Sequence, residues 1–288
     1  MAGSGKAGLL LFGALVAATG AAAFPAGIAE ADVNAVKLAP HRAIYDLRLA
    51  QTRHSRGAEA VTGRILYDFS GNSCEGYALQ FRQVSSLDNG GGRPSVSDLR
   101  ATTWEDGKAG SFRFNSQNSL DEKSVESVDG MAERGAGGVA VNLTKPGQKK
   151  FQIDAGLVFP TEHMRLIIAA ARAGKTVLEL PVYDGSENGE KVFSTLSVIG
   201  RPIPPDQRVP TDAAKGQAAL AALTRWPVTI SYYEKEKDGK GGEQQPIYSI
   251  SFELYENGIS RALLLDYNDF VLRGEMSSLE IKDAKPCR

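Results

Sequence analysis

Residues 247–267 read IYSISFELYENGISRALLLDY, and this stretch decides the fold. Two runs in which apolar and polar residues largely alternate, 247–255 and 259–267, flank the dipeptide Asn257-Gly258. Alternation with a period of two is typical of a β-strand, and Asn-Gly is a preferred dipeptide of tight hairpin turns. The stretch therefore predicts two antiparallel strands joined by a short turn.

The same pattern recurs on both sides of this hairpin. Further strands are predicted at residues 41–49, 61–69, 77–84, 100–105, 111–115, 124–128, 131–134, 139–143, 175–183, 191–199, 226–234 and 270–281. Turn dipeptides separate many of them: Gly71-Asn72, Asp106-Gly107, Asp129-Gly130, Pro146-Gly147, Asn188-Gly189 and Asp238-Gly239. Local hairpins therefore dominate the chain, and no alternation of strands with helices indicates a doubly wound fold.

Two segments depart from the strand pattern. The first follows Phe159-Pro160: Thr161 is the expected N-cap, the apolar residues continue to Ala171, and Gly174 ends the helix. The second is the alanine-rich segment 212–224, which predicts either a helix or a connector on the surface. The fold class is therefore mainly β, a large antiparallel sheet curved into a spiral or open barrel-like roll, with two helices.

The first 31 residues predict a removable export signal. Lys6 supplies the basic start, and residues 9–18 form an apolar run too short to span a bilayer. Small residues place the cleavage after Ala31, with Ala23 as the alternative. We expect a periplasmic mature chain, residues 32–288, that forms one β-spiral domain without a transmembrane span. Its net charge of −1 gives no basic face for nucleic acid.

The only cysteines are Cys74 and Cys287. In an exported chain the oxidising compartment favours a disulfide between them, and a pair of free thiols is the alternative. A thiol dyad of Cys74 with His163 would need the reduced form, so the disulfide argues against it.

No motif indicates catalysis, a metal site or a cofactor. The three histidines lack the short ligand spacings of zinc sites, and no G-x-S-x-G elbow is present. The candidate residues for a cleft or a partner-binding surface are Thr161 and His163 at the helix start, and Trp226 in the aromatic-rich C-terminal region. The simpler interpretation is that His163 is satisfied locally and that Trp226 packs in the core.

Four segments together resemble a known family. They are 41–45 (HRAIY), 71–77 (GNSCEGY), 159–163 (FPTEH) and the C-terminal Cys287, and they look like the cell-envelope integrity protein B family. The resemblance covers nearly all of the mature chain. It implies a periplasmic protein of Gram-negative envelopes, a long antiparallel sheet bent into a spiral, and one disulfide.

The resemblance also implies a function. The family has no assigned catalytic residues, it is similar in shape to lipoprotein carriers, and a periplasmic partner with tetratricopeptide repeats is implied. We therefore expect a non-enzymatic protein that supports envelope integrity by binding a protein or lipid partner. The alternative is a carrier of lipid or lipoprotein acyl chains in an apolar cleft. A hydrolase is the third hypothesis.

Overall fold

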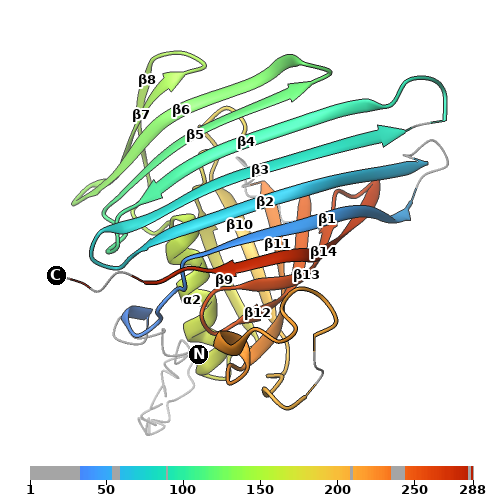
Figure 1. Cartoon of the computed structure of the whole chain (residues 1–288). Helices are drawn as coiled ribbons and strands as arrows, with labels where there is room; N and C mark the ends of the chain where they lie inside the picture. Colours follow the sequence, from blue (N-terminus) through green and yellow to red (C-terminus); the bar gives the residue numbers. More distant parts are fainter. Residues whose placement is uncertain are drawn as a thin grey trace, which may run out of the picture.

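The computed structural model describes residues 33–53, 59–88, 90–207, 210–234, 244–284 and 287. One antiparallel sheet of 14 strands makes up most of these residues (Figure 1). The strands are β1 (His41–Thr52), β2 (Ala60–Asn72), β3 (Gly76–Asp88), β4 (Ser95–Glu105), β5 (Ser111–Leu120), β6 (Lys123–Gly135), β7 (Gly138–Lys145), β8 (Lys149–Ile153), β9 (Val177–Val182), β10 (Phe193–Ile199), β11 (Arg225–Glu234), β12 (Tyr248–Tyr255), β13 (Ser260–Asp266) and β14 (Phe270–Ile281).

The sheet is open and has two arms. Its order is β8-β7-β6-β5-β4-β3-β2-β1-β14-β13-β12-β11-β10-β9, so β8 and β9 form the two edges. The first and last strands, β1 and β14, pair in the middle from His41 opposite Ile281 to Thr52 opposite Phe270. Figure 1 shows the arm from β1 to β8 in front and the other arm curling behind and below it. The prediction of a mainly β, antiparallel sheet is thus confirmed.

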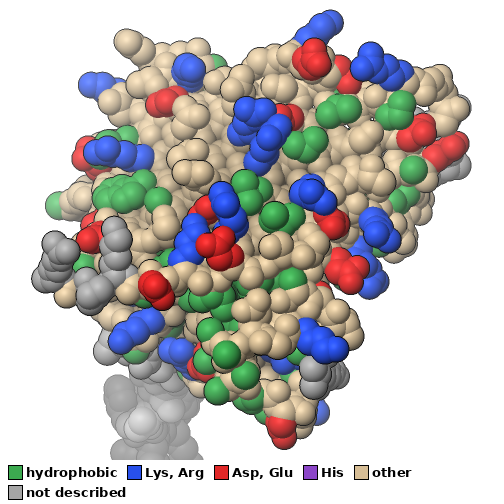
Figure 2. Space-filling view, in the orientation of Figure 1, with side chains coloured by type: hydrophobic (Ala, Val, Ile, Leu, Met, Phe, Trp, Pro, Cys, Tyr) green, Lys and Arg blue, Asp and Glu red, His purple; other side chains and the backbone are tan. Residues whose placement is uncertain are grey.

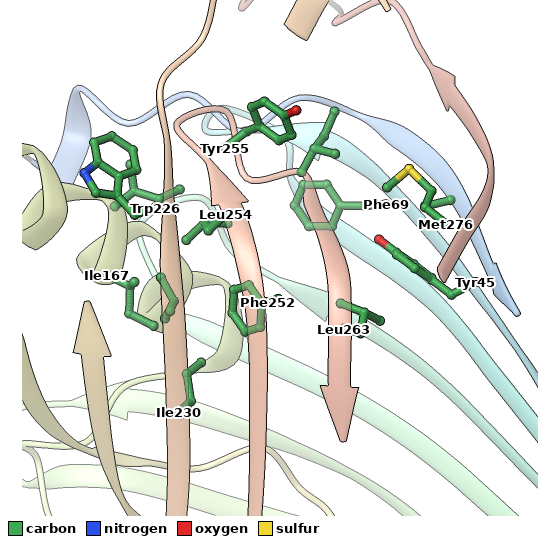
Figure 3. Packing of buried hydrophobic residues seen from close by; sticks show 14 of the residues in the cluster. Tyr45, Phe69, Ile167, Trp226, Ile230, Phe252, Leu254, Tyr255, Leu263 and Met276 are labelled. Carbon is green, nitrogen blue, oxygen red and sulfur yellow. The ribbon is translucent and has the colours of Figure 1, made fainter. Parts of the chain in front are cut away.

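Alternation decides which face of each strand is buried. On β1, Ala43, Tyr45 and Leu47 are buried, whereas Arg42 and Arg48 between and beside them are exposed. The inner faces of both arms share one large apolar core with the helix α2 (Pro160–Arg172). Figure 3 shows part of this core, with residues of β1, β2 and β11–β14 packed near the helix.

A second, smaller core lies under strands β5–β7. Four aromatic rings form its centre: Phe112 stacks on Phe114 and on Phe159, and Tyr183 meets Phe114 edge to face. The Tyr183 hydroxyl donates to the Gly189 carbonyl at 2.7 Å. The segment between β9 and β10 is thereby held against the inner face of the first arm, and its Glu190 pairs with Lys149 of the edge strand β8.

The predicted turn at Asp129-Gly130 is wrong. Both residues lie inside β6, where the register against β7 shifts by one residue, so the two short strands predicted around them are one strand. Packing leaves no space for a side chain at Gly130. A Cβ atom would lie 2.6 Å from the Phe114 ring and 2.8 Å from Leu143. By contrast, Asn257-Gly258 makes the predicted hairpin turn, with Gly258 at a φ of +87°.

The second predicted helix is also wrong. Residues 212–224 form turns with only a short 3₁₀ helix, η1 (Ala218–Leu220). Gly216 has a φ of +77°, which no α-helix accommodates. The segment bonds to β14 and β13 instead: the Ala213 N–H donates to the carbonyl of Met276, beyond the part of β14 that pairs with β13, at 3.1 Å, and the Asp212 carboxylate accepts from Arg261 of β13 at 2.9 Å. These tertiary contacts outweigh the helix propensity of the alanines.

The outer face of the first arm is polar. Figure 2 shows basic and acidic side chains mixed across it, without a large region of one sign. One example is Asp98 on β4, whose carboxylate lies 2.9 Å from Arg82 and 2.8 Å from Arg100. These ion pairs are largely exposed, so each contributes little to stability. The pattern fits a solvated outer surface.

The disulfide predicted between the two cysteines is present. Cys74 lies in the turn after β2, and its Cα atom is 5.7 Å from that of Cys287, 213 residues later. The bond ties the β2–β3 turn to the chain beyond β14. The predicted signal peptide and the turn Asp238-Gly239 lie outside the described residues. Among the helices that the structure describes, none combines the length and apolar character that crossing a membrane requires.

Candidate functional site

A cavity of about 230 Å³ lies on the inner side of the sheet, against the first turn of α2. Its walls come from both arms, from the helix and from the β12–β13 turn. The lining residues are Leu38, Ala39, His41, Tyr67, Phe69, Leu79, Thr103, Pro160, Thr161, His163, Met164, Val182, Asp184, Ile230, Tyr232, Asn257 and Gly258. Most of these side chains are apolar or aromatic, and a few polar groups converge among them, as in many small-molecule sites.

A carboxylate from a distant strand holds the helix start in place. Glu105, the last residue of β4, accepts the backbone N–H of Thr161 and that of Glu162, each at 2.7 Å. The first N–H groups of a helix have no partner within the helix, and a negative charge there is favourable. The N-cap position itself is Phe159, which carries no capping side chain. The predicted cap at Thr161 is therefore wrong, because Glu105 supplies the acceptor from outside.

Two further side chains fasten the helix to the first arm. Glu162 lies 2.8 Å from Arg134 of β6, and its carboxylate also accepts the Phe159 N–H at 3.3 Å. Arg165 is buried and donates to the carbonyls of Gly107 and Val33, both at 3.0 Å. The helix thus presents its first turn to the cavity in a fixed orientation.

His163 faces the second arm. Its Nε2 atom lies 3.4 Å from the hydroxyl oxygens of Thr195 and Ser197, both on β10. Burial lowers the pKa of His163 to about 4, so the imidazole is neutral at pH 7. The neighbouring Glu162 is directed to Arg134 and the Phe159 N–H, away from His163.

His41 forms part of the opposite wall. Its ring stacks on Tyr67 with a centroid distance of 5.5 Å, and its Nδ1 lies 2.8 Å from the Ala39 carbonyl. Because a carbonyl only accepts, Nδ1 carries the proton and Nε2 remains an acceptor. Burial lowers the pKa of His41, so this ring is neutral as well. Burial also raises the pKa of Tyr67 to about 12.

The remaining polar groups of the cavity belong to the second arm and the loop after β9. Burial raises the pKa of the Asp184 carboxyl, and burial together with the nearby Asp184 raises the pKa of Tyr232. Among the described residues that line the cavity, none is a lysine or arginine, and Asp184 is the one carboxylic acid.

The structure brings together two of the three candidate residues. Thr161 and His163 line the cavity, whereas Trp226 is 5 % exposed and packs in the main core near Ile167 (Figure 3). Cys74 and Cys287 form the disulfide away from the cavity, so Cys74 is no nucleophile. Across the described residues, no group of three or more His, Cys, Asp or Glu side chains could hold a metal ion.

Sequence reasoning missed most of the cavity. Glu105 carried no local signal, because its partners lie more than 50 residues away. His41 and Tyr67 lie at inward-facing positions of predicted strands, so alternation identified their face but not the cavity. Asp184 follows a predicted strand and carried no signal either.

The fold and the site define a class of protein: one open antiparallel sheet wrapped around a helix, with a small, mostly apolar cavity beside that helix. The EipB-like family matches residues 32–283. Cell envelope integrity protein EipB of Brucella abortus (strain 2308) is 39% identical over 271 residues, 93% of this chain and 94% of that protein. The chain belongs to the EipB-like family, which confirms the resemblance seen in its motifs.

A solved structure has the same fold. It is the crystal structure of a β-barrel-like protein of the domain of unknown function DUF1849, from Brucella abortus. It matches with a TM-score of 0.78 and 38% sequence identity, and the match covers 86% of this chain and 100% of that one.

Proposed function

We propose that this chain is a non-enzymatic protein of the periplasm that supports the integrity of the cell envelope by binding another envelope component. The cavity beside α2 carries this proposal, because it offers a partly open, mostly apolar binding space on the inner face of the sheet. The name of the Brucella relative, cell envelope integrity protein EipB, supports the envelope role.

The polar groups around the cavity support binding rather than catalysis. Both oxygens of Glu105 accept N–H groups of the helix, and His163 lies against two hydroxyls of β10. A general base needs a free acceptor directed at a substrate and a pKa near the working pH. His163, with a pKa of about 4, is a weak base, and Glu105 serves the helix.

The second candidate function is a carrier of lipid or lipoprotein acyl chains. The apolar walls favour it, among them Leu38, Phe69, Met164 and Ile230. The volume argues against it, since 230 Å³ lies below the 300–1,000 Å³ or so of typical ligand sites. A protein partner, including one with tetratricopeptide repeats, stays a prediction of the family resemblance.

The test is a deletion strain of the source organism. We expect lower resistance to detergents and to cell-wall antibiotics, and recovery when the full-length chain is supplied. A matched variant with the cavity filled, Leu79→Trp, should be exported at the normal level but should fail to restore resistance. Equal resistance of the deletion strain and its parent would contradict the envelope role.

A further inference from the structure

We propose that the cavity beside α2 binds one uncharged, polyhydroxylated six-membered ring, that is, a single sugar residue of a cell-envelope glycan. This inference deepens the proposed binding function and rests on it. Four properties of the cavity carry it: the ring faces in its walls, its unpartnered polar atoms, its lack of basic side chains and its size.

Aromatic faces form much of the wall. His41 and Tyr67 stack at 5.5 Å, and Tyr67 stacks on Phe69 at 6.3 Å, so three rings of β1 and β2 form one continuous surface. Tyr232 on β11 lines the cavity from the other arm. Large rigid rings supply contact area to the C–H face of a flat ligand, and tyrosine adds a polar group at its edge.

Several polar atoms in these walls have no partner among the described residues. Among the described residues, Nε2 of His41 and the hydroxyls of Tyr67 and Tyr232 make no hydrogen bond. None of the three is a fully buried atom, so each remains accessible to a ligand. An alkyl chain in the cavity would leave all three groups buried and unpaired, which is unfavourable. A ligand with several hydroxyls pairs with them.

The charges of the cavity disfavour anionic ligands. Both histidines are neutral at pH 7, because burial lowers the pKa of each. Among the described lining residues, none is a lysine or arginine, so a phosphate or carboxylate would find no counter-charge there. The Asp184 carboxyl, whose pKa burial raises, offers a further hydrogen-bond partner for a ligand hydroxyl.

The size of the cavity selects a single ring. Its volume of about 230 Å³ lies below the roughly 300–1,000 Å³ of typical ligand sites. A space of this size favours one small ring over a chain of several. The rest of a glycan would have to lie outside the cavity.

The test is a titration of the mature, disulfide-bonded protein with N-acetylglucosamine and, separately, with glucose, followed by NMR. We expect saturable shifts of cavity residues for at least one sugar below about 10 mM. Tyr67→Phe and Tyr232→Phe keep the rings and remove one hydroxyl each, so each should weaken binding about five- to tenfold. The matched control is Tyr233→Phe, because Tyr233 points to the other face of β11 and does not line the cavity.

Three results would overturn the inference. They are the absence of saturable shifts with both sugars at about 10 mM, unchanged sugar affinity in both cavity variants, and a fluorescent fatty acid that binds more tightly to Tyr232→Phe than to the wild type. The last result would assign the cavity to an acyl chain. If the wild type restores envelope resistance but binds neither sugar, the envelope role stands and the sugar site falls.

Discussion

The Glu105 carboxylate accepts the backbone N–H of Thr161 at 2.7 Å, although 56 residues separate them in the sequence. With the second bond, to the Glu162 N–H, this side chain joins the end of β4 to the start of α2. The first turn of α2 carries His163 into the cavity wall. The position of the cavity wall therefore depends on a carboxylate that does not line the cavity.

Removing this carboxylate should destabilise the protein. In Glu105→Ala, two helix N–H groups lose their acceptor in a buried place, so we expect the free energy of unfolding to fall by about 1–3 kcal/mol. Urea unfolding measures this change. Glu133→Ala on β6 is the control, because Glu133 is exposed on the sheet, and its effect should stay within about 0.5 kcal/mol. Equal stability of the two variants would show that Glu105 does not hold the helix.

Glu105 should also make stability depend on pH. Burial raises its pKa to about 7 from an ordinary value of 4.5. The folded state therefore binds the proton more tightly than the unfolded state, and this contribution to stability is complete below about pH 4.5 and is lost as the pH rises through about 7. We expect the stability of the wild type relative to Glu105→Gln to decrease from pH 4.5 to pH 8 in thermal unfolding. A constant difference would contradict the raised pKa.

His163 should produce the opposite pH dependence. Its folded pKa is about 4, below its ordinary 6.5, so the stability that it contributes is present above pH 6.5 and is lost as the pH falls through about 4. His163→Gln should flatten the acid limb of the stability curve by up to about 1.4 kcal/mol per pH unit. His41 has a lowered pKa for the same reason and leaves a residual slope. An unchanged acid limb would mean that His163 is accessible to solvent.

Reduction of the disulfide should weaken the fold. Closing a loop of 213 residues stabilises a protein by on the order of 5 kcal/mol in the chain-entropy model. Cys74 and Cys287 are both exposed, so a reductant reaches them. We expect a lower unfolding midpoint in dithiothreitol and a similar midpoint for Cys74→Ser without it. The double variant Cys74→Ser/Cys287→Ser is the control, because its midpoint should not respond to the reductant.

Gly130 should tolerate no side chain. In Gly130→Ala the added Cβ would lie 2.6 Å from Phe114 and 2.8 Å from Leu143, so we expect a loss of about 1–3 kcal/mol. Gly137→Ala is the control, since nothing lies within 4 Å of its Cβ position. Urea unfolding of both variants checks the difference, and similar values would show that the strands move apart easily.

The sequence predicted the local parts of the fold well. Period-two alternation located most strands, and the turns Asp106-Gly107, Asn188-Gly189 and Asn257-Gly258 lie between neighbouring strands as expected. The strand β8 was missed, because its five residues, KKFQI, are too short and too basic for a clear alternation. Local signals thus suffice where neighbours in sequence are also neighbours in space.

Long-range contacts explain the errors. Gly130 reads as a turn residue but serves the packing of Phe114, and residues 212–224 read as a helix but bond to β14 and Arg261. Most of the cavity could not be predicted for the same reason, because its walls come from segments that are distant in sequence. Its residues come from β1–β4, the helix, the loop after β9 and β11, so no single segment of the sequence reveals it.

The pairing of β1 with β14 has a consequence for the order in which the protein is built. The strand nearest the start of the described chain hydrogen-bonds along its length with the last strand, at the centre of the sheet. A ribosome or a secretion channel delivers the chain from one end. Hairpins within each arm can therefore form before β1 and β14 pair at the centre of the sheet. Contacts of such high sequence separation form slowly. The pairing at the centre of the sheet is therefore completed only when the final strand arrives, and any factor that assists this step would have to act until that moment.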